Sequence, residues 1–156
     1  MSCLINNSKN MEDTIYFAQL NENNIIITVY SCSCNECCDY LGNRSENIGI
    51  GLCQKRYGAD TIWKETFKDG RRGNFAGIGY TYIPDANTLG VGSTDIFISQ
   101  KPYPSWSLDP NLPIWKSPLE KPSLTEEQQN AGSSYIWDED AYQNDNMTGW
   151  IFIDHS

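Results

Sequence analysis

Residues 15–30, IYFAQLNENNIIITVY, carry the clearest strand pattern of the chain. Its two runs, IYFAQL and IIITVY, are rich in β-branched and aromatic residues, a composition typical of strands. The polar sequence NENN between them supplies asparagines, which tolerate the positive φ of a tight turn. The pattern predicts a β-hairpin at the start of the folded region.

The segment at residues 43–57 has the strongest helix pattern in the chain. Either its first residue or Ser45 can cap the N-terminus, and a Lys-Arg pair in the last turn complements the helix dipole. Gly58 is placed to stop the helix in the αL conformation. Gly49 and Gly51 weaken the helix by about 1 kcal/mol each, which indicates that the helix approaches a sheet closely.

A second β-rich region covers residues 61–100. The runs TIWKETF, NFAGIGYTYI and DIFISQ each predict a strand, and glycine-rich or polar segments separate them. Between Trp63 and Trp106 the chain is dense in aromatic residues, glycine and proline but contains no histidine or cysteine. This composition is typical of a module that acts by shape and contact.

The sequence contains little that points to catalysis. Its only histidine, His155, is the residue before the last, where chain ends usually fray. No general base with an orienting partner is visible in the pattern. We therefore expect no enzymatic activity and no cofactor.

Beyond position 100 the chain becomes rich in proline and tryptophan. Two segments, SWSLDPNLPIWKSP and YIWDEDAYQNDNMTGWIF, each place a turn between two tryptophans, which is the layout of a short hairpin with paired aromatics. The polar linker between them, residues 116–134, has room for one helical turn at residues 124–129. We thus predict three parts: an N-terminal arm (residues 1–13), a core domain (14–100) and a C-terminal extension (101–156).

Together these elements predict an α+β fold that is mainly β. We expect a small twisted antiparallel sheet with one helix against it, followed by the proline- and tryptophan-rich extension of short hairpins. A single core domain with appendages agrees with the length of 156 residues.

The charge of the chain excludes some partners. A net charge of −9 and a pI near 4.4 argue against nucleic acid and anionic membranes, since both attract basic surfaces. No apolar run approaches the length of a membrane span. The N-terminus lacks the regions of a signal peptide, so we expect a chain that is made and used without secretion by that route.

The cysteines are the residues with the most chemical potential. A tetrahedral zinc site needs four thiolates, and the candidate ligands are Cys32, Cys34, Cys37 and Cys53. Their spacing argues against zinc, because knuckles and ribbons use two separated pairs. Buried free thiols and one disulfide bond, such as Cys37–Cys53, are the other interpretations.

Five aromatic residues of the extension are candidates for an interaction surface: Tyr103, Trp106, Trp115, Trp137 and Trp150. Their structural interpretation is packing within the hairpins, because aromatic side chains supply large contact areas. Their functional interpretation is contact with neighbouring proteins. A sugar-binding platform of exposed rings is the alternative.

Several motifs follow one another in a specific order over about residues 15–150: YFAQLNENNIIITV, ENIGIGLCQKRYGADTIWKETF, RGNFAGIGYTYI, DIFISQKPYPSW, W-x2-P and YIWDED with a closing Trp. This order resembles a family of short proteins in tailed phages of cyanobacteria and other aquatic bacteria. The resemblance implies a component of the virion and supplies no catalytic residues.

The resemblance also bears on the cysteines. Only Cys37 and Cys53 have counterparts in the family pattern, so it favours a contact between these two over a four-thiolate metal site. The N-terminal arm and the additional cysteines depart from the pattern; these cysteines are Cys32, Cys34 and Cys38.

We therefore expect a structural protein of a phage particle, present in multiple copies and in contact with other virion proteins. A capsid decoration or cement protein and a component of the tail or its fibres both fit, with assembly in the host cytoplasm. One alternative is a tail module that binds a host-surface glycan through its tryptophans. Another is an intracellular phage protein that binds a host protein.

Overall fold

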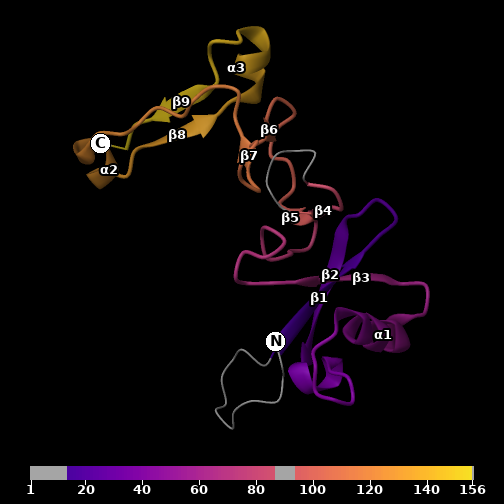
Figure 1. Cartoon of the computed structure of the whole chain (residues 1–156). Coiled ribbons are helices and arrows are strands. Elements are labelled where there is room, and N and C mark those ends of the chain that lie inside the picture. Colours follow the sequence, from indigo (N-terminus) through magenta and orange to yellow (C-terminus); the bar gives the residue numbers. More distant parts are fainter. Residues whose placement is uncertain (1–13, 87–93, 156) are drawn as a thin grey trace. The chain divides into compact units, whose positions relative to one another are not determined.

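The structure, a computed structural model, describes residues 14–86 and 94–155 (Figure 1). Its architecture is α+β and mainly β, with small antiparallel sheets and few helices, so the predicted fold class is confirmed. The predicted N-terminal arm, residues 1–13, lies outside the described residues. None of the helices in the described ranges is long and apolar enough to cross a membrane.

The chain forms two compact units. The first contains the described residues up to Gln100 together with Pro110–Ile114. The second contains Lys101–Asp109 together with the described residues from Trp115 onward. The long segment of the first unit therefore ends at the predicted domain limit, residue 100. The first unit also includes Pro110–Ile114, which the predicted limits assign to the extension.

The main sheet of the first unit has three antiparallel strands in the order β2-β1-β3 (Figure 1). They are β1 (Thr14–Leu20), β2 (Ile26–Ser33) and β3 (Ile62–Thr66). The turn between β1 and β2 contains Asn24 at φ 60°, and the side chain of Asn21 accepts two of its backbone N–H groups. The predicted hairpin is confirmed, and β3 joins its sheet.

Helix α1 (Glu46–Tyr57) follows the predicted helix closely. It begins after Ser45, whose hydroxyl accepts the backbone N–H of Ile48. It ends at Gly58, where φ is 130° and ψ is 141°. The glycine therefore has a positive φ, as predicted, but lies outside the αL region.

Close packing against the sheet explains one of the two glycines in α1. A Cβ at Gly49 would lie 2.1 Å from Cζ of Phe17, which is fully buried in β1. At Gly51 a Cβ would meet nothing within 4 Å. The predicted close approach is thus confirmed for Gly49 and wrong for Gly51.

A second, two-stranded sheet in the first unit consists of β4 (Thr81–Ile83) and β5 (Ile96–Ile98). The strand predicted from NFAGIGYTYI is much shorter than expected, because residues 74–80 are irregular, with a turn that contains Gly79 at φ 85°. The backbone N–H of Gly79 donates to the carbonyl of Ile26, which attaches this turn to β2.

The second unit contains two short hairpins and two short helices: β6 (Ser107–Leu108), β7 (Trp115–Lys116), α2 (Glu126–Asn130), β8 (Ser134–Trp137), α3 (Glu139–Asn144) and β9 (Trp150–Ile153). In the β8–β9 pair Trp137 lies opposite Trp150, so the predicted pairing of aromatics is confirmed there. In the β6–β7 pair Trp115 lies opposite Leu108, so the same prediction is wrong for that hairpin. The predicted helical turn in the linker is α2.

Candidate functional site

The second unit is built around three tryptophans that pack against one another. The ring centres of Trp137 and Trp150 are 5.3 Å apart, and Trp106 lies 6.0 Å from each of them. Tyr103 packs on Trp106 and Tyr142 on Trp137. The contacts of Trp137 with Trp106 and with Trp150 are edge-to-face, a geometry that stabilises beyond the area it buries. Only 6% of Trp137 is exposed, so this ring is a packing residue.

Glu139 connects this aromatic cluster to a segment distant in the sequence. Its carboxylate accepts the indole N–H of Trp137 at 2.8 Å, and both the backbone N–H and the hydroxyl of Ser105, at 3.1 and 2.7 Å. Desolvation raises the pKa of Glu139, but the hydrogen bonds from Ser105, Trp137 and Gln143 outweigh it and lower the pKa to about 2. The carboxylate is therefore charged at neutral pH and holds the aromatic cluster in place.

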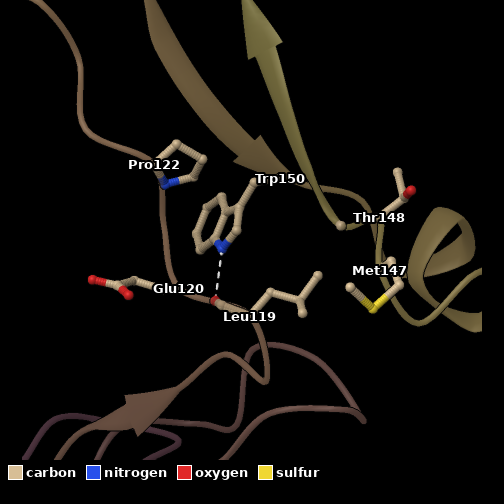
Figure 2. A pocket seen from close by; sticks show the side chains of 7 residues that line it. Leu119, Glu120, Pro122, Met147, Thr148 and Trp150 are labelled. Carbon is tan, nitrogen blue, oxygen red and sulfur yellow. Dashed lines mark hydrogen bonds between the residues drawn. The ribbon is translucent and has the colours of Figure 1, made fainter.

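A pocket of about 350 Å³ opens beside Trp150 (Figure 2). Besides Gly149 its lining residues are Leu119, Glu120, Pro122, Met147, Thr148 and Trp150. Figure 2 shows the indole of Trp150 between Pro122 and Leu119, whose carbonyl accepts the indole N–H at 3.0 Å. The ammonium of Lys121 lies 5.2 Å from the centre of the same ring.

Gly149 is required for the packing of this hairpin, which the sequence alone does not indicate. A Cβ there would lie 2.4 Å from two ring atoms of Trp137. Only glycine therefore allows the chain to pass under this ring at the start of β9. Trp115, the remaining candidate, lies in β7 with the ammonium of Lys101 5.7 Å from its ring centre.

The cysteine cluster lies in the first unit. Cys32 in β2, Cys37 in the 3-10 helix η2 (Cys34–Cys37) and Cys53 in α1 are buried in one core, and all three are free thiols. The sulfur atoms of Cys32 and Cys37 are 3.0 Å apart. Among residues 14–86 and 94–155 no group of three or more His, Cys, Asp or Glu side chains is arranged to hold a metal ion.

Burial makes these thiols poor nucleophiles. Desolvation raises the pKa of Cys32, and desolvation together with the hydrogen bond between the two thiols raises the pKa of Cys37 to about 12. Desolvation also raises the pKa of Cys53 to about 11. The predicted pair, Cys37 and Cys53, thus shares a core without a disulfide bond between them.

A short loop next to this cluster exposes two large side chains. We call residues 38–44 the Asp39 loop; a β-bridge between Cys38 and Arg44 closes its base. Tyr40 is 95% exposed and Leu41 is 58% exposed. The sequence analysis missed this loop, although its DYLG sequence, with Asp at the first position of a turn and Gly at the fourth, is a turn signal.

Hydrogen bonds that the Asp39 carboxylate accepts order the Asp39 loop. Its carboxylate accepts the backbone N–H groups of Leu41 and Asn43, both at 2.9 Å, and the side-chain amide of Asn43 at 3.3 Å. The hydrogen bonds from Asn43, chiefly its backbone N–H, lower the pKa of Asp39. Gly42 at φ 81° completes the turn. The loop therefore holds its two exposed side chains in a defined position.

Charged side chains cover the outer edge of β3. The carboxylate of Glu46 accepts the backbone N–H of Glu65 at 3.1 Å, and the guanidinium of Arg72 donates to the carbonyl of Glu65 at 2.9 Å. Arg72 also binds both carboxylate oxygens of Glu46 and forms an ion pair with Asp95. Arg44 forms an ion pair with Glu65. Because each of these carboxylates has an arginine partner, the network is a structural one.

Comparison with known proteins does not assign the chain to a family. No family model matches the chain, and no curated protein or solved structure is significantly similar to it. The resemblance to the phage proteins therefore stays a prediction made from the order of the motifs.

Proposed function

We propose that the chain is a structural protein of a tailed-phage particle and acts through protein–protein contacts. The observation that carries the proposal is the Asp39 loop, which presents Tyr40 and Leu41 to solvent on a hydrogen-bonded turn. An ordered loop loses little conformational entropy when a partner buries its side chains. Aromatic side chains are also enriched among the residues that carry most binding energy at interfaces.

The partners in this proposal are other virion proteins. The net charge of −9 disfavours direct binding to packaged nucleic acid, and the order of the motifs resembles that of phage proteins. Quantitative mass spectrometry of purified particles tests the proposal. Tens or hundreds of copies per particle would identify a capsid decoration or cement protein, and a few copies would identify a tail or fibre component. Absence from the particles would overturn the proposal in favour of an intracellular phage protein that binds a host protein.

Substitutions in the Asp39 loop test the contact itself. The double change Tyr40→Ser with Leu41→Ser should lower binding to particles that lack the chain by about tenfold or more, as loss of an aromatic anchor does. The melting temperature should stay unchanged, because both side chains are exposed. The matched control is Ile78→Ser, a change at another apolar residue of the same unit that is 75% exposed. Equal binding by the double variant and the control would place the contact elsewhere.

Binding of a host-surface glycan is the second candidate, and the pocket beside Trp150 favours it. The pocket combines an indole in its wall with polar side chains of Glu120 and Thr148, and sugars bind to such combinations. Titration of host polysaccharide should then change the tryptophan fluorescence, and Glu120→Gln should weaken the response. An unchanged spectrum at saturating polysaccharide would exclude this candidate.

A further inference from the structure

Cys32 and Cys37 lie close enough to become covalently linked. Cys32 is near the end of β2, Cys37 is the last residue of η2, and their sulfur atoms are 3.0 Å apart. A disulfide bond has an S–S distance of about 2.05 Å, so an approach of about 1 Å separates the two states. Within the described residues this short sulfur contact joins Cys37 to Cys32 rather than to Cys53.

We propose that Cys32 and Cys37 are a modification site at which a low-molecular-weight disulfide, RSSR, produces an intramolecular disulfide bond. First, the thiolate of Cys32 attacks one sulfur of RSSR and releases one thiol. Next, the thiolate of Cys37 attacks the Cys32 sulfur of this mixed disulfide and releases the second thiol. Two protein thiols and RSSR thus become one protein disulfide and two RSH, with two electrons passing to the oxidant and the protons to the released thiols.

Burial sets the order and the rate of these steps. Cys32 retains slight exposure whereas Cys37 has none, so the oxidant reaches Cys32 first. The raised pKa of both thiols leaves little thiolate at neutral pH. The reaction therefore needs local opening of the chain around η2 and is slow in the native protein.

The bond fixes the base of the Asp39 loop. The carbonyl of Cys37 accepts the backbone N–H of Ser45 at 2.8 Å, and the bridge between Cys38 and Arg44 follows directly. Linking Cys37 to β2 therefore attaches this base to the main sheet. Formation of this disulfide bond goes beyond the proposed function and does not depend on it.

Peptide mapping identifies the bonded pair. The full chain carrying Cys3→Ser, Cys34→Ser and Cys38→Ser, which keeps Cys32, Cys37 and Cys53 as its cysteines, is incubated with glutathione disulfide, alkylated, and cut with a glutamyl-specific protease without reduction. Cys32, Cys37 and Cys53 then fall on three different peptides, which are residues 23–36, 37–46 and 47–65. The expected product is the first peptide joined to the second, with Cys53 alkylated on the third. A link between the second and third peptides, or three alkylated peptides after prolonged incubation, would overturn the proposal.

Two further variants in the same background serve as controls. Cys37→Ser should abolish the link, and Cys53→Ala should leave its yield unchanged. The same background provides a second measurement: oxidation should raise the melting temperature of the first unit by about 5 °C, and reduction should reverse the shift. If Cys53→Ala lowers the yield of the disulfide-linked product as far as Cys37→Ser does, Cys53 takes part in the bond. That result would contradict the inference.

Discussion

At the scale of single residues, Gly49 packs α1 closely against the main sheet. A Cβ there would lie 2.1 Å from the buried ring of Phe17. Gly49→Ala should therefore lower the free energy of unfolding by about 1–3 kcal/mol, because overpacking outweighs the gain in helix propensity. Denaturant titration followed by tryptophan fluorescence measures this change.

Gly51 provides the matched control, because it lies in the same helix with open space around it. Gly51→Ala should raise the free energy of unfolding by about 1 kcal/mol through helix propensity alone. Changes of the same sign at both positions would contradict the close contact between Gly49 and Phe17.

Glu139 makes the stability of the second unit depend on pH. Its folded-state pKa of about 2 lies below the ordinary value of 4.5, so its contribution is fully present above pH 4.5. The contribution should decrease as the pH falls from 4.5 through 2, because the neutral acid loses charge-assisted hydrogen bonds. Thermal unfolding of the wild type and of Glu139→Gln, followed by tryptophan fluorescence, measures this. The difference in melting temperature should be larger at pH 7 than at pH 2; a constant difference would refute the assignment.

At the scale of elements, the order of the Asp39 loop depends on one carboxylate. Asp39→Ala removes the acceptor of the Leu41 and Asn43 backbone N–H groups. These amides should then exchange with solvent faster, by about fivefold or more, as hydrogen-exchange NMR measures. Asp39→Asn keeps an oxygen acceptor and should restore much of the protection. Equal rates in all three proteins would mean that the side chain does not order the loop.

Helices and strands that carry local sequence signals, such as caps and turn residues, were predicted from the sequence. The β1–β2 hairpin follows from strand-forming runs on both sides of an Asn-rich turn, and α1 follows from its cap and terminal glycine. Long-range contacts were not accessible in this way. The proximity of Cys32 and Cys37 depends on how η2 folds back on β2, and the sequence interval between two cysteines does not encode this geometry.

The difference between local signals and long-range contacts also explains why the predicted strand at residues 74–83 was too long and why the packing of the tryptophans was not predicted. The segment NFAGIGYTYI has strand-like composition, but its first part is irregular and binds β2 through hydrogen bonds of Gly79 and Tyr80 with Ile26. Mutual packing of Trp106, Trp137 and Trp150 depends on tertiary contacts that composition does not determine. The sequence therefore identified the interacting residue types, while the structure determined which of them meet.

At the scale of the whole molecule, the first unit is discontinuous in sequence. Pro110–Ile114 belongs to it, and the side-chain amide of Asn74 donates to the carbonyls of Pro113 and Phe97 at 2.7 and 3.1 Å. A fragment that ends at Gln100 lacks one of these acceptors. It should melt about 5 °C below a fragment that ends at Ile114, as calorimetry measures. Asn74→Ala in the longer fragment should remove part of this advantage, and equal melting temperatures of the two fragments would contradict the assignment.

The charged side chains at the outer edge of β3 also affect how the chain behaves at high concentration. An edge strand with free N–H and C=O groups is a template on which other chains polymerise. At Glu65 the carboxylate of Glu46 and the guanidinium of Arg72 occupy both backbone groups. A second molecule must therefore break an ion pair before it can add a strand at this position. Chains at high concentration are thus protected at this position from adding strands to one another.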